Sequence, residues 1–283
     1  MSLHGVNVRL IRASRVKPAR TVAIVFLAVV VIACALPSFV SNLDYAHQFR
    51  DLPDAAPSHQ HWLGTDDLGR DRFARVLYGT RVSLLLAPAA AGIACLLAAL
   101  IGGTAGFAGG WLERVVLTGI DLFLSLPWLF LLITVRALLP LNGSPITSVV
   151  ITFALLGCLG WAAAARVVCS DARQLRDSDF ILLARASGSG GFRLFHRHLL
   201  PNLMPVLLAQ FWISIPVFIL TEANLGVLGL GVSEPLPSWG SLLRELQIYS
   251  SISSNPWQFV PLLLFIAVVS SFHLVVADRE LPS

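Results

Sequence analysis

Charge is scarce in this sequence. Of its 283 residues only 13% are Asp, Glu, Lys or Arg, which is about half the share found in an ordinary soluble domain. Hydrophobic residues reach 56%, and a soluble domain this apolar would expose large hydrophobic patches. A disordered chain, by contrast, would be polar and highly charged. The composition excludes both classes and indicates an integral membrane protein.

Lysine is almost absent, since Lys17 is the only one in the chain. A P-loop needs a lysine followed by Ser or Thr after a glycine-rich turn, because the ammonium binds nucleotide phosphates. Lys17 instead stands between Val16 and Pro18, so we expect no P-loop ATP hydrolysis by this chain. The four cysteines are too few for a disulfide scaffold. His59 and His61 alone do not make a metal site, and no metal ligand set is predicted.

Six segments have the length and apolar character of membrane-spanning helices, which need about 20 mostly apolar residues. The sequence therefore predicts an all-α protein with six spans. They lie at 21–40, in the first part of 82–112, at 115–135, at 146–165, within 199–230 and within 257–276. The predicted organisation is a tail at 1–20, a first span at 21–40, a hydrophilic segment at 41–81, a core at 82–277 and a short tail at 278–283.

Basic residues set the predicted orientation, because they accumulate on the cytoplasmic side of membranes. With the N-terminus inside, 13 of the 20 Lys and Arg residues fall on the inner side, five of them in the tail before residue 21. Both termini are thus expected in the cytoplasm, and this basic tail indicates topology rather than nucleic-acid binding. Residues 33–35 also resemble a cleavable signal. Small residues are equally ordinary in membrane helices, and we adopt an uncleaved anchor.

The inner segment at 166–202 carries the clearest local pattern. Residues 177–179 (Asp-Ser-Asp) offer an N-cap, residues 180–187 have the spacing of a short helix, and the glycines of 188–191 end it. Phe180, Leu183, Ala184 and Ser187 fall close to one stripe. Such a helix could dock another protein, or it could rest on anionic lipid as an amphipathic segment. The residues by themselves leave both alternatives open.

Four ordered motifs resemble those of ABC-transporter permeases in the oligopeptide/dipeptide/nickel importer family, and most closely the shorter (OppC/DppC type) subunit. The first, Leu-Ala-Arg-Ala-Ser-Gly at 183–188 followed by His-Leu-Leu-Pro-Asn at 198–202, resembles the family's EAA loop. This segment differs from the EAA loop in having Leu182 where the family has glutamate. The others are 61–71 with 78–84, Asp121 with 126–127, and 222–231 with 237–240.

The resemblance implies an N-terminal anchor helix followed by a five-helix type I importer core with a cytoplasmic coupling helix. It implies a homologous second permease, two cytoplasmic ATPases that bind ATP and Mg, and an extracytoplasmic substrate-binding protein, in the bacterial cytoplasmic membrane. No cofactor is implied in this chain. The implied cargo is a peptide, with nickel or glutathione as alternatives in the same family. The implied coupling residues are Leu183, Ala184, Arg185, Ala186, Ser187 and Gly188.

Ionisable residues inside spans are costly and are functional candidates. Glu222, with Asn224 beside it, could line the substrate pathway and bind a peptide ammonium. Glu222 could equally form a structural pair with Arg136 or Arg81. For Asp121 we favour a structural ion pair with an arginine near the inner loop. The alternative class is a proton-coupled secondary transporter that uses Asp121 and Glu222 as relays, although the internal repeats common in that class are absent.

Overall fold

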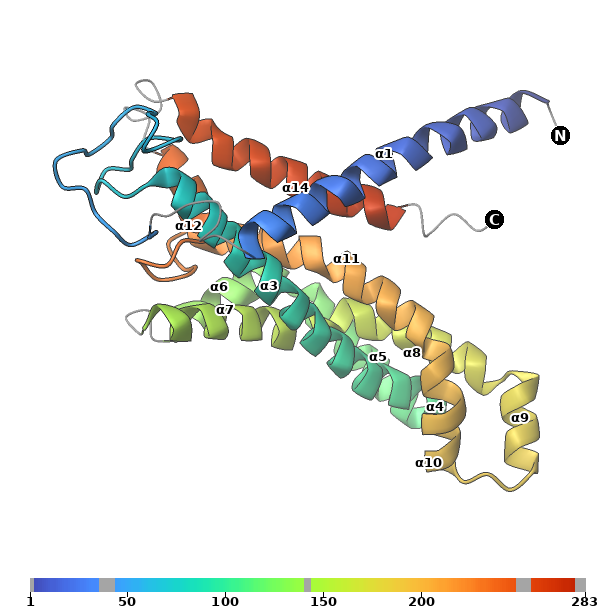
Figure 1. Ribbon diagram of the computed structural model, residues 1–283. Helices are drawn as coiled ribbons and strands as arrows, with labels where there is room; N and C mark the ends of the chain where they lie inside the picture. The colour runs from blue at the N-terminus through green and yellow to red at the C-terminus, as the bar shows by residue number, and fades with distance from the viewer. Residues whose placement is uncertain (1–2, 36–43, 140–143, 248–255, 278–283) are drawn as a thin grey trace. The chain divides into compact units, whose positions relative to one another are not determined.

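The computed structural model describes residues 3–35, 44–139, 144–247 and 256–277 (Figure 1). Across these residues the regular structure is helical, apart from two isolated β-bridges. The longer helices are α1 (Leu3–Ala35), α3 (Arg72–Ala98), α5 (Gly110–Ser125), α6 (Trp128–Ala137), α7 (Pro145–Leu159), α8 (Trp161–Arg176), α11 (Leu200–Val227) and α14 (Phe259–Ala277). The shorter ones are π-helical η1 (Ala99–Gly103), α4 (Thr104–Ala108), α9 (Asp179–Ala186), α10 (Gly191–Leu194), π-helical η2 (Phe195–Leu199) and α12 (Trp239–Arg244).

Five helical runs are long and apolar enough to cross a membrane: 18–35, 72–108, 145–176, 191–227 and 256–276. The bent pair α5 and α6 makes a sixth when it is counted as one span. The prediction of an all-helical, six-span membrane protein is confirmed on that count. Residues 36–40 of the predicted first span and the predicted tail at 278–283 lie outside the described residues.

The third span differs from its prediction, because 115–135 is not one straight helix. α5 ends at Ser125, α6 begins at Trp128, and the two meet at an angle of 80°. Leu126 has an extended backbone, as expected for a residue that precedes proline, and Pro127 has no N–H to continue the helix. Apolarity over 115–135 indicated the span, while this proline decides where it breaks.

Several spans are also longer than predicted. The run through α3, η1 and α4 begins at Arg72, ten residues before the apolar segment, and the run through α7 and α8 continues to Arg176. Apolarity marks only the part of a helix suited to the hydrocarbon layer. Each of these helices continues beyond its apolar segment into polar sequence.

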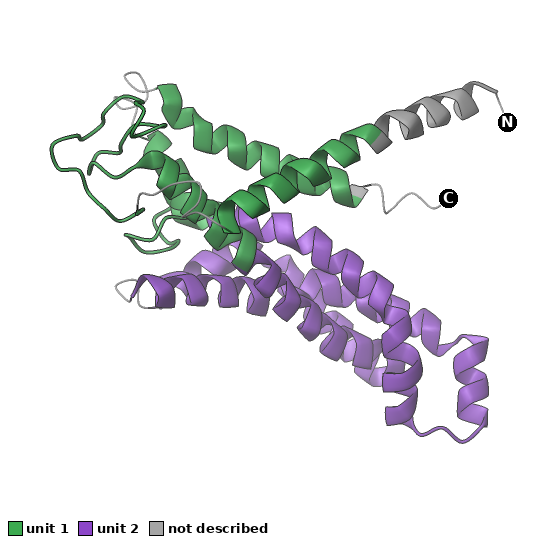
Figure 2. Ribbon diagram, viewed as in Figure 1, with its two compact units in different colours: residues 1–85, 223–283 green, residues 86–222 purple. Residues whose placement is uncertain are grey.

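The chain divides into two compact units (Figure 2). Residues 1–85 and 223–283 form the first unit, in which α1 and α12 both pack against α14. Trp239 of α12 is fully buried there, with its ring centroid 5.4 Å from that of Phe265. Residues 86–222 form the second unit.

The core of the second unit depends on small residues where η1 and α4 pack against α8. A Cβ at Gly102 would lie 2.3 Å from the carbonyl oxygen of Ala165, and one at Gly106 would lie 2.3 Å from that of Cys169. Side-chain carbon atoms do not approach backbone so closely, so both positions require glycine. Small residues four positions apart are typical of closely packed membrane helices, and Gly102 and Gly106 form such a contact. Gly110, four residues further on, does not extend this contact, because a Cβ there would meet nothing within 4 Å.

We expect Gly106→Ala to destabilise the protein, because overpacking against rigid backbone costs about 1–3 kcal/mol. Gly92→Ala is the matched control, since a Cβ added at that helical glycine would meet no other atom within 4 Å. Alanine at an open helical site should be neutral or stabilising by about 0.5–1 kcal/mol. The thermal unfolding midpoint of the purified protein in detergent checks both, and equal midpoints for the two variants would contradict the packing argument.

Candidate functional site

The short helix α9 occupies the middle of the predicted inner segment, within one residue of its predicted bounds. Ser178 holds the N-cap position, and Asp179 places negative charge in the first turn, where the helix dipole favours it. The side chain of Ser178 donates to the carbonyl of Leu175 rather than accepting a helix amide. The residue at the predicted cap is correct, but the side-chain capping bond is not formed.

The C-terminus of α9 is closed by backbone geometry. Gly188 has a φ of +79°, its N–H donates to the carbonyl of Arg185 over 3.0 Å, and the N–H of Ser189 donates to that of Ala184 over 3.2 Å. These two bonds and the left-handed glycine make a Schellman motif. The predicted glycine stop is therefore present, and it fixes the direction in which the chain leaves α9.

One side chain anchors α9 while several others are exposed. Ile181 is fully buried, and α9 packs against α8 and α10. Phe180 and Leu183 are 42% and 69% exposed, and these two residues lie one helical turn apart. The remaining predicted coupling residues are Ala184, which is half-buried, and Arg185, Ala186, Ser187 and Gly188, which are exposed. A short helix fixed on one side thus presents an apolar stripe on the other.

A buried carboxylate ties the start of α5 to the end of α8, directly before α9. Glu113 is only 7% exposed, and its carboxylate lies 3.0 Å from Arg173 and 3.5 Å from Arg176. Arg176 also donates to the carbonyl of Gly106 over 3.2 Å and pairs with Asp177, which lowers the pKa of that exposed carboxyl. Glu113 is not among the site residues predicted from the sequence. The sequence does contain an indication of this ion pair. A single glutamate follows the apolar segment at 82–112, and the inner segment contains arginines that could pair with it.

Asp121 lies 3.1 Å from Arg166, which connects α5 to α8 a second time. Arg166 stands at the start of the inner segment, where a partner for Asp121 was expected. Both side chains are more than half exposed, so the pair contributes at most about 1 kcal/mol. This geometry agrees with a structural pair, and the role of Asp121 stays a proposal.

The two predicted pathway residues are not brought together. Glu222 is fully buried, whereas Asn224 is exposed. Positions two apart in an α-helix lie about 200° apart around its axis, so the two side chains leave α11 on nearly opposite faces. The sequence analysis placed Glu222 and Asn224 together in the substrate pathway, whereas helical periodicity directs the two side chains to different surfaces.

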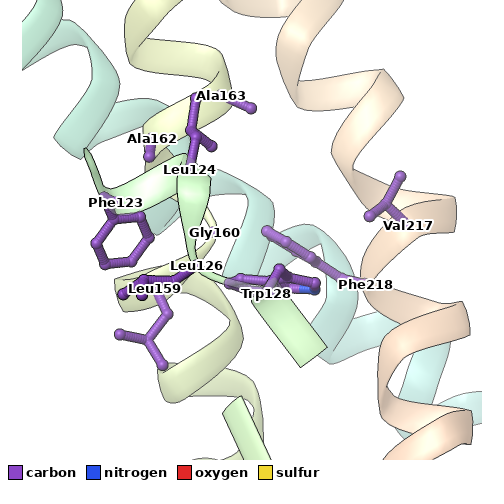
Figure 3. Close-up of a pocket in the computed structure, with 10 residues that line it drawn as sticks. All are labelled: Phe123, Leu124, Leu126, Trp128, Leu159, Gly160, Ala162, Ala163, Val217 and Phe218. Atoms are coloured by element: carbon purple, nitrogen blue, oxygen red, sulfur yellow. The ribbon is translucent and has the colours of Figure 1, made fainter. Parts of the chain in front are cut away.

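An apolar cavity of about 210 Å³ lies beside the break in the third span (Figure 3). Its lining comes from both sides of the break, from the α7–α8 junction at Gly160 and from α11 at Val217 and Phe218. A Cβ at Gly160 would lie 2.6 Å from the Phe218 ring, so the missing side chain leaves room for that ring. The lining contains no ionisable residue, so the cavity offers space rather than acid–base chemistry.

These features define a multi-pass membrane protein with an anchored helix outside its spans. The chain belongs to the family of binding-protein-dependent transport system inner membrane components, whose model matches residues 75–279. It is 31% identical to the dipeptide transport system permease protein DppC of Bacillus subtilis over 84% of this chain and 72% of that protein. It is 31% identical to the oligopeptide transport system permease protein OppC of B. subtilis, over 89% of this chain and 80% of that protein. It is 38% identical to the nickel transport system permease protein NikC of Escherichia coli K12, over 88% of this chain and 89% of that protein.

The family establishes the class of protein that the sequence predicted. The chain is a permease subunit of an ABC importer and a multi-pass inner-membrane protein; it is a transporter component and not an enzyme, and ATP hydrolysis belongs to separate subunits. Such permeases work with ATPases and a binding protein. Within the described part of the chain, no three His, Cys, Asp or Glu side chains are grouped as metal ligands.

The Schellman motif allows a specific test of how α9 is held. We expect Gly188→Ala to loosen the last turn of α9, because a side chain at φ +79° costs about 1 kcal/mol. Hydrogen exchange of the amides of residues 184–189 should become several-fold faster. Gly190→Ala is the matched control, since Gly190 has a φ of −67° and open space around it. Equal protection in both variants would show that the glycine does not set this turn.

Proposed function

We propose that this permease imports short peptides, and that α9 is the helix through which its ATPases drive it. The peptide cargo is supported by two relatives named as dipeptide and oligopeptide permeases. The role of α9 is supported by its anchored position and exposed apolar stripe. A third relative is named as a nickel permease, which makes nickel the alternative cargo.

The coupling mechanism follows from how α9 is attached. Only residues 177 and 178 separate it from α8, and Ile181 anchors it. An ATPase that binds Phe180 and Leu183 would therefore move α9 together with the end of α8. The Glu113 pairs then carry that motion to α5. ATP shifts the transporter's equilibrium if the ATPases hold α9 differently in their open and closed states.

The proposed assembly contains this chain, a homologous second permease, two cytoplasmic ATPases that bind ATP and Mg, and an extracytoplasmic binding protein. Both termini and the segment at 166–202 face the cytoplasm, while 41–81 faces outward. Residues 1–20 form the basic tail, 21–40 the anchor and 82–277 the permease core. The distribution of basic residues supports this orientation.

We expect Leu183→Asp to uncouple the transporter without unfolding it, because Leu183 is 69% exposed and a carboxylate there disfavours an apolar groove. Recovery of the ATPases with the permease should fall at least tenfold, and ATP-driven uptake of alanyl-alanine should be lost. Leu183→Met is the conservative control and should retain both. Normal ATPase recovery and normal uptake in Leu183→Asp would contradict the coupling role of α9. A wild-type transporter that imports nickel but not the dipeptide would overturn the proposed cargo.

Full burial of Glu222 favours its structural alternative over a place in the pathway. We therefore expect Glu222→Gln to lower the yield of assembled complex several-fold, while uptake per assembled complex stays within about twofold. Asn224→Ala is the comparison, since Asn224 is exposed and should not affect assembly. A normal yield with altered uptake per complex would instead place Glu222 in the pathway.

A further inference from the structure

The turn that precedes α3 is built on a buried aspartate. Asp66 is fully buried and accepts backbone N–H groups from Leu68 over 3.0 Å and Arg70 over 2.7 Å. It also accepts the Nε–H of Arg70 over 2.6 Å and lies 3.5 Å from Nε of Arg75. These contacts fix the backbone of 66–70 and leave the side chain of Asp67, the next residue, exposed.

Two glutamates from later in the chain bind arginines of this region. Glu234 accepts from Nη1 of Arg70 over 2.5 Å and from Nη2 of Arg75 over 3.1 Å, and Glu245 accepts from Nη1 of Arg72 over 2.6 Å. All three arginines are buried. Removing one member of such a pair leaves an uncompensated buried charge, so these contacts hold the loop after α11 against the start of α3.

A cavity of about 520 Å³ with several charged residues in its lining lies at this junction, within the first unit. Asp67, Arg70, Glu234, Arg244 and Glu245 line it, together with glycines that follow and end α11. A Cβ at Gly229 would lie 3.4 Å from Nη1 of Arg244, so that guanidinium extends over a residue without a side chain. The volume falls within the range of about 300–1,000 Å³ that is usual for small-molecule sites.

The charges of the cavity fall into two groups. Arg70, Glu234 and Glu245 are held in the ion pairs described above. Asp67 and Arg244 are exposed, and neither side chain has a hydrogen bond or ion pair with another described residue. Burial raises the pKa of Glu245, and the negative charge of Asp67 adds to that rise. One uncompensated cation and one uncompensated carboxylate therefore face the same space.

We propose that this cavity binds a short zwitterionic peptide, with Arg244 receiving its carboxylate and Asp67 its ammonium group. The proposal rests on the proposed peptide import and on the outward orientation of 41–81. Two opposite charges in one cavity suit a ligand that carries both, whereas a divalent cation would be repelled by Arg244. The cavity is thus a first site for cargo that leaves the binding protein.

Binding to the purified transporter in lipid nanodiscs, without the binding protein, tests the site directly. The probes are alanyl-alanine, its C-terminal amide and its N-acetyl derivative, titrated by saturation-transfer NMR. We expect Arg244→Gln to raise the Kd of alanyl-alanine about fivefold, as for one exposed charge-assisted contact, and to leave the Kd of the amide unchanged. Asp67→Asn should raise the Kd of the free dipeptide but leave the Kd of the N-acetyl form unchanged. Arg50→Gln and Asp51→Asn are matched controls, since both residues are exposed and lie outside the cavity lining.

The outcomes separate this site from the proposed function. Equal Kd values in wild type, Arg244→Gln and Asp67→Asn, or no binding at all, would overturn the cavity proposal even where the complete transporter imports the dipeptide. If Arg244→Gln raised the Kd of the free dipeptide and of its amide equally, the cavity proposal would also be contradicted. Such a result would indicate a general distortion of the cavity rather than the loss of a contact with the carboxylate. Dipeptide binding that depends on Arg244, in a complete transporter that imports none, would uphold the cavity and refute peptide import.

Discussion

The approach of η1 and α4 to α8 is the contact on which the second unit depends. Gly102 and Gly106 place their backbones against the carbonyls of Ala165 and Cys169, so that one helical segment lies in the groove of the other. Lipid supplies no hydrophobic driving force between apolar helices, and close van der Waals packing of small residues takes its place. α8 is therefore fixed along much of its length, and the end of α8 carries α9. The same contact that stabilises the core also holds the base of α9, the proposed coupling helix.

Charged residues reinforce that base where the helices leave the apolar layer. Arg173 and Arg176 of α8 meet Glu113 of α5, and Arg166 meets Asp121 about two turns away along both helices. The Glu113 pairs are partly removed from water and the Asp121 pair is exposed, so the former contribute more to the α5–α8 contact. A displacement of α9 would thus reach α5 mainly through Glu113.

The sequence predicted the parts of the structure that depend on local pattern. The spans follow from apolar runs, and α9 follows from its N-terminal residues and Gly188, because helix ends are set by residues a few positions apart. The 80° bend at Pro127 was accessible in principle, since a proline inside an apolar run is visible, but its angle depends on packing. Ion pairs such as Glu113–Arg173 and Arg70–Glu234 join residues 60 and 164 positions apart, and spacing alone does not select the partner. Glu222 and Asn224 show the reverse case, in which helical periodicity by itself separates the two faces.

Two pairs of exposed side chains, one apolar and one charged, carry the two binding proposals. The charged groups around Glu113 and around Asp66 are largely held in ion pairs. Phe180 and Leu183, by contrast, are exposed apolar residues on a helix too short to cross a membrane, which suits a protein partner. Asp67 and Arg244 are charges without partners among the described residues, at the edge of a cavity whose other charges are compensated. The proposed ATPase contact would cover Phe180 and Leu183, and the proposed peptide would supply an opposite charge to Asp67 and to Arg244.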